Sequence, residues 1–148
     1  MGRITLDVME DAITEFCAHC HTASSFAGWW TDPVTGLSLI PARNFDTERL
    51  QADIIELWFP YVIATKIALI HSEVSEALEG YRRDAADDKL PHFKAITVEL
   101  ADVMIRIGDL AGCLNLPIAK ALRDKMGYNG ERPDHKMVNR RKPGGKLF

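Results

Sequence analysis

Residues 66–109 read KIALIHSEVSEALEGYRRDAADDKLPHFKAITVELADVMIRIGD, and this stretch decides the fold. On both sides of a short polar link, Arg82–Pro91, apolar residues recur with the period of an amphipathic helix. Two helices joined by so short a link pack antiparallel against each other. The sequence therefore predicts an all-α fold, a bundle of four or five helices built around this pair.

Each helix of the pair carries two carboxylates. Glu73 and Glu76 lie three residues apart on the first helix, and Glu99 and Asp102 on the second, so each pair shares a helix face. Both pairs border the apolar stripe and are displaced from it in the same rotational sense, whereas Glu79 points toward solvent. If the pairs converge, four carboxylates require a cation, and Mg²⁺ or Mn²⁺ suits an all-oxygen ligand set. The alternative interpretation is that both pairs are solvated surface.

The ordered set of motifs resembles a known family. Glu73-x-x-Glu76 followed by Glu99-Leu-Ala-Asp102-Val103 is similar to the all-α nucleoside triphosphate pyrophosphohydrolases of the MazG-like group, over roughly residues 66–132. The resemblance extends into KMGYNGERP at 125–133, similar to the Lys, Asn and Arg-Pro pattern that follows the last helix in many members. It implies a hydrolase of nucleotide metabolism that uses Mg²⁺ to cut a nucleoside or deoxynucleoside triphosphate between its α- and β-phosphates. The products are the nucleoside monophosphate and pyrophosphate.

The resemblance also implies roles for the site residues and an oligomeric state. The four carboxylates bind the metal and serve catalysis, and one of them acts as a general base through water. Relatives form dimers or dimers of dimers, so self-association as a dimer or tetramer is expected. Val62, Leu69 and Ile105 have no obvious partner within one small bundle, which favours the same conclusion.

Cationic and aromatic side chains are the candidate substrate ligands. Lys66 and Arg106 lie near Glu73 and Glu99 on the helical wheels, so they bind phosphate or pair with those carboxylates. For Lys125 and Asn129 the alternative is a solvated helix face and a C-terminal cap. The tryptophan pair either stacks on the base or seals a core or subunit interface. The full set is Lys66, Arg106, Lys125, Asn129, Arg132, Trp29 and Trp30.

The rest of the chain predicts further helices and one long loop. Thr5 is a candidate N-cap for a helix to about His21. Residues 23–46 are rich in Gly and Pro and predict a structured loop, with a short hairpin around Asp32–Gly36. Two more helices are expected: one starts at Asp46 or Thr47 and breaks or kinks at Pro60, and one starts at Pro117 and stops at Gly130.

Bulk properties limit the function classes. The 148 residues carry a net charge of −3, which argues against a nucleic-acid-binding protein. The chain divides into a pyrophosphohydrolase domain, 1–132, and a basic tail, 133–148, which is flexible or folds over the site to meet phosphate. An acidic N-terminal region and the absence of an uninterrupted apolar run of membrane-span length predict a cytoplasmic protein without a membrane partner. Cys17-x-x-Cys20-His21 matches a haem-attachment pattern, but free thiols are expected in such a protein.

Two other functions share features of this sequence. A di-iron bundle also uses four acidic residues from paired helices, but its sites carry Glu-x-x-His, and here Glu76 and Asp102 occupy the histidine positions. The second competitor is a non-enzymatic helical interaction module whose acidic edge binds a metal or a basic partner.

Overall fold

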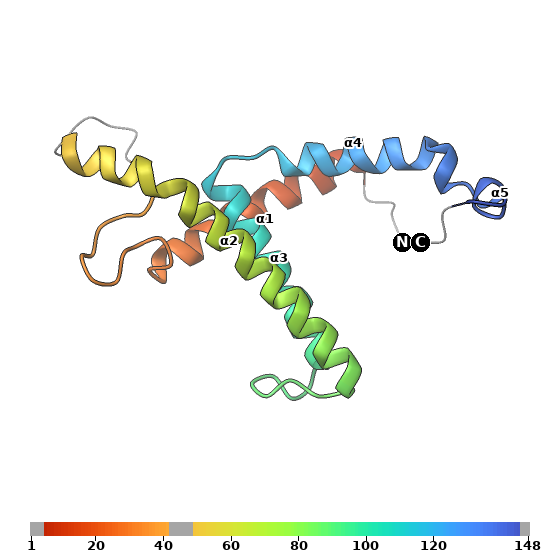
Figure 1. Ribbon diagram of the computed structural model, residues 1–148, viewed down its shortest axis with the longest axis horizontal. Helices are drawn as coiled ribbons and strands as arrows, with labels where there is room; N and C mark the ends of the chain where they lie inside the picture. The colour runs from red at the N-terminus through yellow and green to blue at the C-terminus, as the bar shows by residue number, and fades with distance from the viewer. Residues whose placement is uncertain (1–4, 42–48, 146–148) are drawn as a thin grey trace. The chain divides into compact units, whose positions relative to one another are not determined.

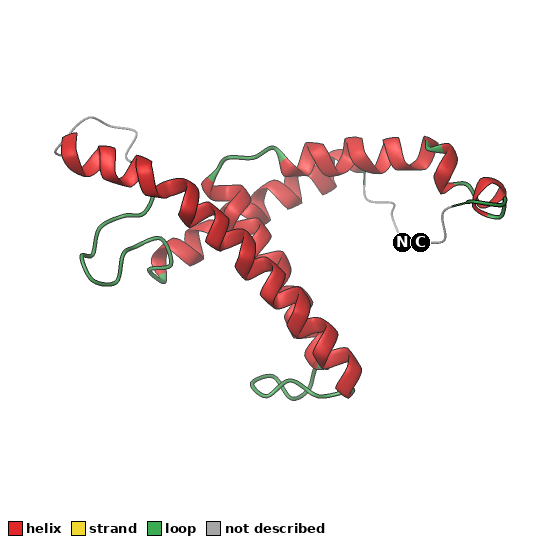
Figure 2. Cartoon of the chain, in the orientation of Figure 1, coloured by secondary structure: helices red, strands yellow, loops and turns green. Residues whose placement is uncertain are grey.

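The computed structural model describes residues 5–41 and 49–145, which form helices, turns and loops with no β-strand among them (Figures 1 and 2). The helical elements are, in chain order, α1 (Leu6–Phe26), α2 (Arg49–Arg83), α3 (Ala95–Cys113), α4 (Ile118–Glu131), the 3₁₀ helix η1 (Pro133–His135) and α5 (Met137–Arg140). The predicted all-α class is confirmed. The chain forms two compact units: residues 16–115, and residues 1–15 together with 116–148.

The pair of helices predicted from residues 66–109 forms the centre of the unit 16–115. α2 and α3 pack side by side along the length of α3 (Figure 1). Gly80 permits this close approach, because a Cβ atom at that position would lie 2.8 Å from the Cβ of Ala95. The link closes through an isolated antiparallel bridge between Ala86 and Lys94, and Ala77 is buried in the helix pair.

The C-terminal half of α1 crosses α3 at two glycines one helical turn apart. A Cβ on Gly108 would lie 3.0 Å from the Cys20 sulfur, and one on Gly112 would lie 2.7 Å from the Cys17 carbonyl oxygen. Only glycine allows the two helix backbones to approach this closely. Cys17 and Cys20 are buried at this crossing, and neither forms a disulfide.

The boundaries of α2 and α4 differ from prediction. α2 continues without interruption through Pro60, so the predicted break is wrong, although Figure 1 shows a change of direction in the first half of this helix. The expected start at Asp46 or Thr47 lies outside the described residues. α4 runs past Gly130 to Glu131, so the predicted stop at Gly130 is also wrong. Extending a formed helix by one more residue costs little free energy. The helix ends before Pro133 instead, because the residue that precedes a proline disfavours helical backbone angles.

The first helix runs past its predicted end at about His21 to Phe26, so the predicted loop start at residue 23 is wrong, whereas the N-cap and the hairpin are confirmed. Thr5 caps α1, since its hydroxyl accepts a hydrogen bond from the Val8 amide at 3.4 Å. The expected hairpin forms a turn closed by an antiparallel bridge between Thr31 and Ser38. Within it the Asp32 carboxylate accepts hydrogen bonds from the Val34 and Thr35 amides, at 3.1 and 2.7 Å.

The described chain buries few large apolar side chains. Trp30 is 2% exposed, whereas Leu57, Trp58 and Tyr61 on α2 are 67%, 59% and 64% exposed. Asp53–Arg83 of α2 is also long and apolar enough to cross a membrane by length and composition, with a mean hydropathy of 1.4. The sequence has no uninterrupted apolar run here, because charged residues occur within the stretch, but the average hydropathy tolerates a few of them. Core helices of soluble proteins pass the same test, so the finding is weak evidence for a membrane span.

Candidate metal and nucleotide site

Three of the four predicted carboxylates come together. Glu73 and Glu76 of α2 and Glu99 of α3 each place one carboxylate oxygen so that all three oxygens lie within 4.8 Å of one another. Glu73 is buried, Glu99 is half-buried and Glu76 is exposed. An oxygen-only set of this size fits a divalent ion that retains several waters, as Mg²⁺ does. Glu79 forms an exposed ion pair with Arg83 instead, so the prediction that it points away is confirmed.

Asp102 lies one turn further along α3 and is not one of these three. Burial and the charge of Glu73 raise the pKa of its carboxyl above the ordinary value, and the charge of Arg106 partly offsets them. Its carboxylate lines the cavity next to the cluster. The structure therefore supplies three converging ligands, with a fourth carboxylate at their edge.

The three clustered carboxylates repel one another. Burial raises the pKa of Glu99, and so do a hydrogen bond shared with Glu73 and the charges of Glu76, Glu73 and Asp102. A bound cation would relieve this repulsion, because it supplies the opposite charge directly.

Arg106 connects the carboxylates to the cavity. Its Nε donates a hydrogen bond to Glu73 Oε1 at 2.7 Å, and the guanidinium is partly exposed. The helical wheel predicted Glu99, on the same helix, as the ion-pair partner of Arg106. In the structure its partner is Glu73, on the neighbouring helix α2. One arginine leaves the cluster negative, so the site still favours a divalent cation.

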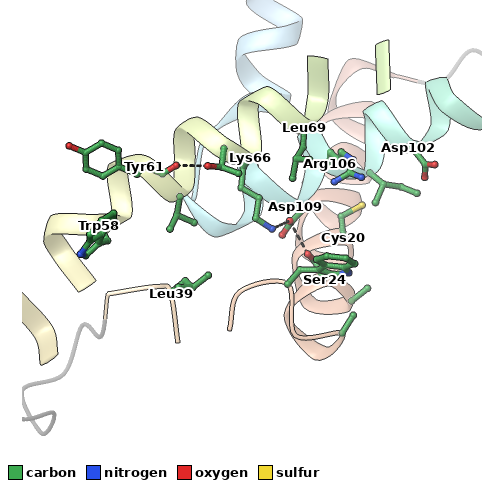
Figure 3. A pocket seen from close by; sticks show the side chains of 16 residues that line it. Cys20, Ser24, Leu39, Trp58, Tyr61, Lys66, Leu69, Asp102, Arg106 and Asp109 are labelled. Carbon is green, nitrogen blue, oxygen red and sulfur yellow. Dashed lines mark hydrogen bonds and ion pairs between the residues drawn. The ribbon is translucent and has the colours of Figure 1, made fainter. Parts of the chain in front are cut away.

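A cavity of 720 Å³ lies beside the carboxylates, within the unit 16–115 (Figure 3). Asp102 and Arg106 belong both to its wall and to the surroundings of the carboxylates, so the two features are continuous. The lining is mainly apolar and aromatic: Cys20, Ala23, Ser24, Ala27, Trp29, Leu39, Trp58, Tyr61, Val62, Thr65, Lys66, Leu69, Asp102, Ile105, Arg106 and Asp109. Its size and chemistry suit a small planar ligand. Val62, Leu69 and Ile105, expected to lack partners, line this cavity.

The two tryptophans have different environments. Trp30 is buried, and its indole nitrogen donates a hydrogen bond to Asp109 at 2.7 Å. Trp29 is 68% exposed and lines the cavity. Trp29 is therefore the one of the pair that is open to a ligand, and Trp30 supports the wall.

Asp109, which is not among the predicted site residues, has the most hydrogen bonds of the described carboxylates. It is 5% exposed and accepts from His21, Ser24, Trp30 and Lys66. Burial alone would raise the pKa of this carboxyl, but the four partners outweigh it and hold the pKa below the ordinary value. Lys66, expected near Glu73, thus pairs with Asp109. The available signal was an acidic residue inside the apolar run 107–111, two helical turns beyond Asp102.

Three predicted substrate ligands, Lys125, Asn129 and Arg132, belong to the other unit. Arg132 Nε donates a hydrogen bond to Asp134 at 2.9 Å, and the Lys125 ammonium lies 5.1 Å from the centroid of the Tyr128 ring. Asn129 is half-buried, and its Oδ1 has no hydrogen-bond partner in the described part of the chain.

Comparison of the chain with protein-family models, with curated proteins and with solved structures finds no match.

Proposed function

We propose that the protein is a metal-dependent nucleoside triphosphate pyrophosphohydrolase of the MazG-like type, with Mg²⁺ or Mn²⁺ as its cofactor. The observation that carries the proposal is the convergence of Glu73, Glu76 and Glu99 within 4.8 Å, beside a cavity with aromatic walls. A carboxylate cluster alone would repel a triphosphate, and an aromatic cavity alone would not bind one. Together, and continuous through Arg106, they suit a ligand with a planar ring at one end and metal-associated phosphates at the other.

In this proposal Glu73, Glu76 and Glu99 would hold the ion, and Asp102 would supply a further oxygen on the cavity side. When bound, the ion supplies positive charge to the phosphates and acidifies a water molecule. Arg106, which pairs with Glu73, would contact a phosphate oxygen. Water supplies a hydroxyl group to one product and a proton to the other as the α–β phosphoanhydride bond breaks, giving monophosphate and pyrophosphate.

The test is product analysis with a panel of ribo- and deoxyribonucleoside triphosphates. We expect pyrophosphate and monophosphate in equal amounts, dependent on Mg²⁺ and abolished by excess chelator. Glu76→Gln should lower the rate by about a hundredfold or more, as expected for loss of a metal ligand. Glu79→Gln, one helical turn further on α2, is the matched control and should keep the rate. Orthophosphate as the only phosphate product would contradict the proposed bond cleavage.

The proposal includes self-association. Exposed aromatic and aliphatic side chains on α2, among them Trp58 and Tyr61, form an apolar surface that a second copy of the chain would cover. The same surface is the observation that favours the alternative of a non-enzymatic interaction module. Sedimentation at micromolar concentration should give a dimer or tetramer. A thermal stability that does not respond to Mg²⁺, combined with a dimer, would favour the module over the enzyme.

A further inference from the structure

Asp109 joins three parts of the chain through one buried carboxylate. Oδ1 accepts hydrogen bonds from His21 Nδ1 at 3.0 Å and from the Trp30 indole at 2.7 Å. Oδ2 accepts from the Ser24 hydroxyl at 2.9 Å and from the Lys66 ammonium at 3.2 Å. A carboxylate offers about four acceptor positions, and all of them are occupied. Asp109 therefore has no free acceptor position for a ligand and acts by holding its donors in place.

Lys66 is the donor that reaches the cavity. Its ammonium lies 4.0 Å from the centroid of the Trp30 ring, and its side chain is 15% exposed and belongs to the cavity wall. An ammonium has three N–H groups. One is bonded to Asp109, and the face of the Trp30 ring takes up a second through a cation–π contact. The third remains for a ligand in the cavity.

The charge around Lys66 indicates what kind of acceptor it meets. Asp109 offsets the charge of Lys66, so the pair presents an N–H donor with little net charge. Such a donor suits a neutral carbonyl oxygen better than a phosphate. Arg106, beside the carboxylates, is the cation at the phosphate end. In Figure 3, Lys66 and Asp109 lie between the aromatic side chains of Trp58 and Tyr61 and the pair Arg106 and Asp102.

We propose that Lys66, positioned by Asp109 and Trp30, donates a hydrogen bond to a carbonyl oxygen of the nucleobase and so selects oxo bases over adenine. The inference rests on the proposed function, because it takes the cavity as the place of the nucleoside. It assigns Lys66 to base recognition rather than to the outer phosphates, and it makes Asp109 a positioning residue. Guanine, hypoxanthine, cytosine, uracil and thymine all carry a ring carbonyl, and adenine carries none.

The test compares inosine triphosphate with adenosine triphosphate, which differ at the purine 6-position as oxo and amino groups. Wild-type protein should favour inosine triphosphate in kcat/KM by up to about tenfold, the contribution of one hydrogen bond. Lys66→Met should bring that ratio close to one by lowering kcat/KM for inosine triphosphate. Lys94→Met, which removes an exposed lysine paired with Asp84, is the matched control and should keep the wild-type ratio.

Asp109→Asn tests the positioning role. Loss of the charged acceptor frees Lys66, so the ratio should fall mainly through a higher KM for inosine triphosphate, with kcat retained. A purely structural role for Asp109 would lower the melting temperature and the active fraction but keep the ratio. If Lys66→Met lowered kcat/KM equally for both nucleotides, Lys66 would contact the phosphates rather than the base, and the inference would be overturned.

A second measurement separates this inference from the proposed function. Inosine and adenosine carry no phosphate, and their binding to wild-type protein can be followed by quenching of tryptophan fluorescence, since Trp29 and Trp58 line the cavity. Tighter binding of inosine without any pyrophosphate release would support the inference and refute the proposed function. Pyrophosphate release at equal rates from both triphosphates would support the proposed function and refute the inference. Failure of both nucleosides to bind would also overturn the inference.

Discussion

Glu99→Gln should change the stability of the protein in opposite directions with and without metal. At 4.8 Å, the largest separation in the cluster, two unit charges repel each other by about 1 kcal/mol in water-like surroundings, and by more where the site is dry. The amide removes this repulsion at nearly constant shape. Without metal, the variant should therefore be more stable by about 1 kcal/mol, or about 2–4 °C in melting temperature for a chain of this size.

Excess Mg²⁺ should reverse the order. A ligand at one hundred times its Kd stabilises the folded state by about 2.7 kcal/mol, and the variant lacks one anionic ligand and gains less. The assay is thermal unfolding in chelator and in increasing Mg²⁺, for wild type, Glu99→Gln and the control Glu79→Gln. The melting temperature of Glu99→Gln should lie above that of wild type in chelator and below it in excess Mg²⁺. Glu79→Gln should show no such reversal. If Glu99→Gln and Glu79→Gln behaved alike in both conditions, the carboxylates would be solvated surface and the reasoning would be refuted.

Three further predictions follow from individual residues. In chelator, wild type should lose stability relative to Glu99→Gln as pH rises above about 4.5, because the raised pKa of Glu99 means that the folded state binds this proton more tightly than the unfolded state does. A difference in melting temperature that stayed constant from about pH 4 to 7 would contradict this. Trp30→Ala should cost about 3–5 kcal/mol in denaturant unfolding, whereas Trp29→Ala should leave stability within about 1 kcal/mol and weaken nucleotide binding, and the opposite order would exchange their roles. Gly112→Ala should destabilise the protein because its Cβ would meet the Cys17 backbone, while Gly127→Ala, with open space around it, should raise stability by about 0.5–1 kcal/mol.

The sequence pattern predicted the helix pair and its carboxylates well because both depend on helical periodicity. Residues three apart share a helix face whatever surrounds the helix, so the pairing of Glu73 with Glu76 is a local property. Convergence across two helices also depends on their rotation and axial offset. That is why Glu99 meets Glu73 and Glu76 closely, while Asp102 lies one turn away on the cavity side.

The ion-pair partners and the Asp109 network could not be predicted in the same way. A helical wheel places Lys66 near Glu73 on one helix, but a long lysine side chain takes the partner that tertiary packing brings closest, which is Asp109. Trp30 and Ser24 reach the same carboxylate only because α1 crosses α3 at its glycines. Of the two outcomes predicted at Pro60, a break or a kink, the break does not occur: a proline inside a helix can be accommodated by bending, and α2 stays continuous while it changes direction in its first half (Figure 1).

Binding of Mn²⁺, followed by the electron paramagnetic resonance signal of the free ion, tests the central claim most directly. We predict that wild-type protein removes the free-ion signal at micromolar to submillimolar concentration. The double variant Glu76→Gln/Glu99→Gln should leave the signal as in buffer, and Glu79→Gln should titrate like wild type. Equal Mn²⁺ binding by wild type and the double variant, or no binding by wild type up to millimolar concentration, would contradict the claim that these carboxylates form a divalent-metal site.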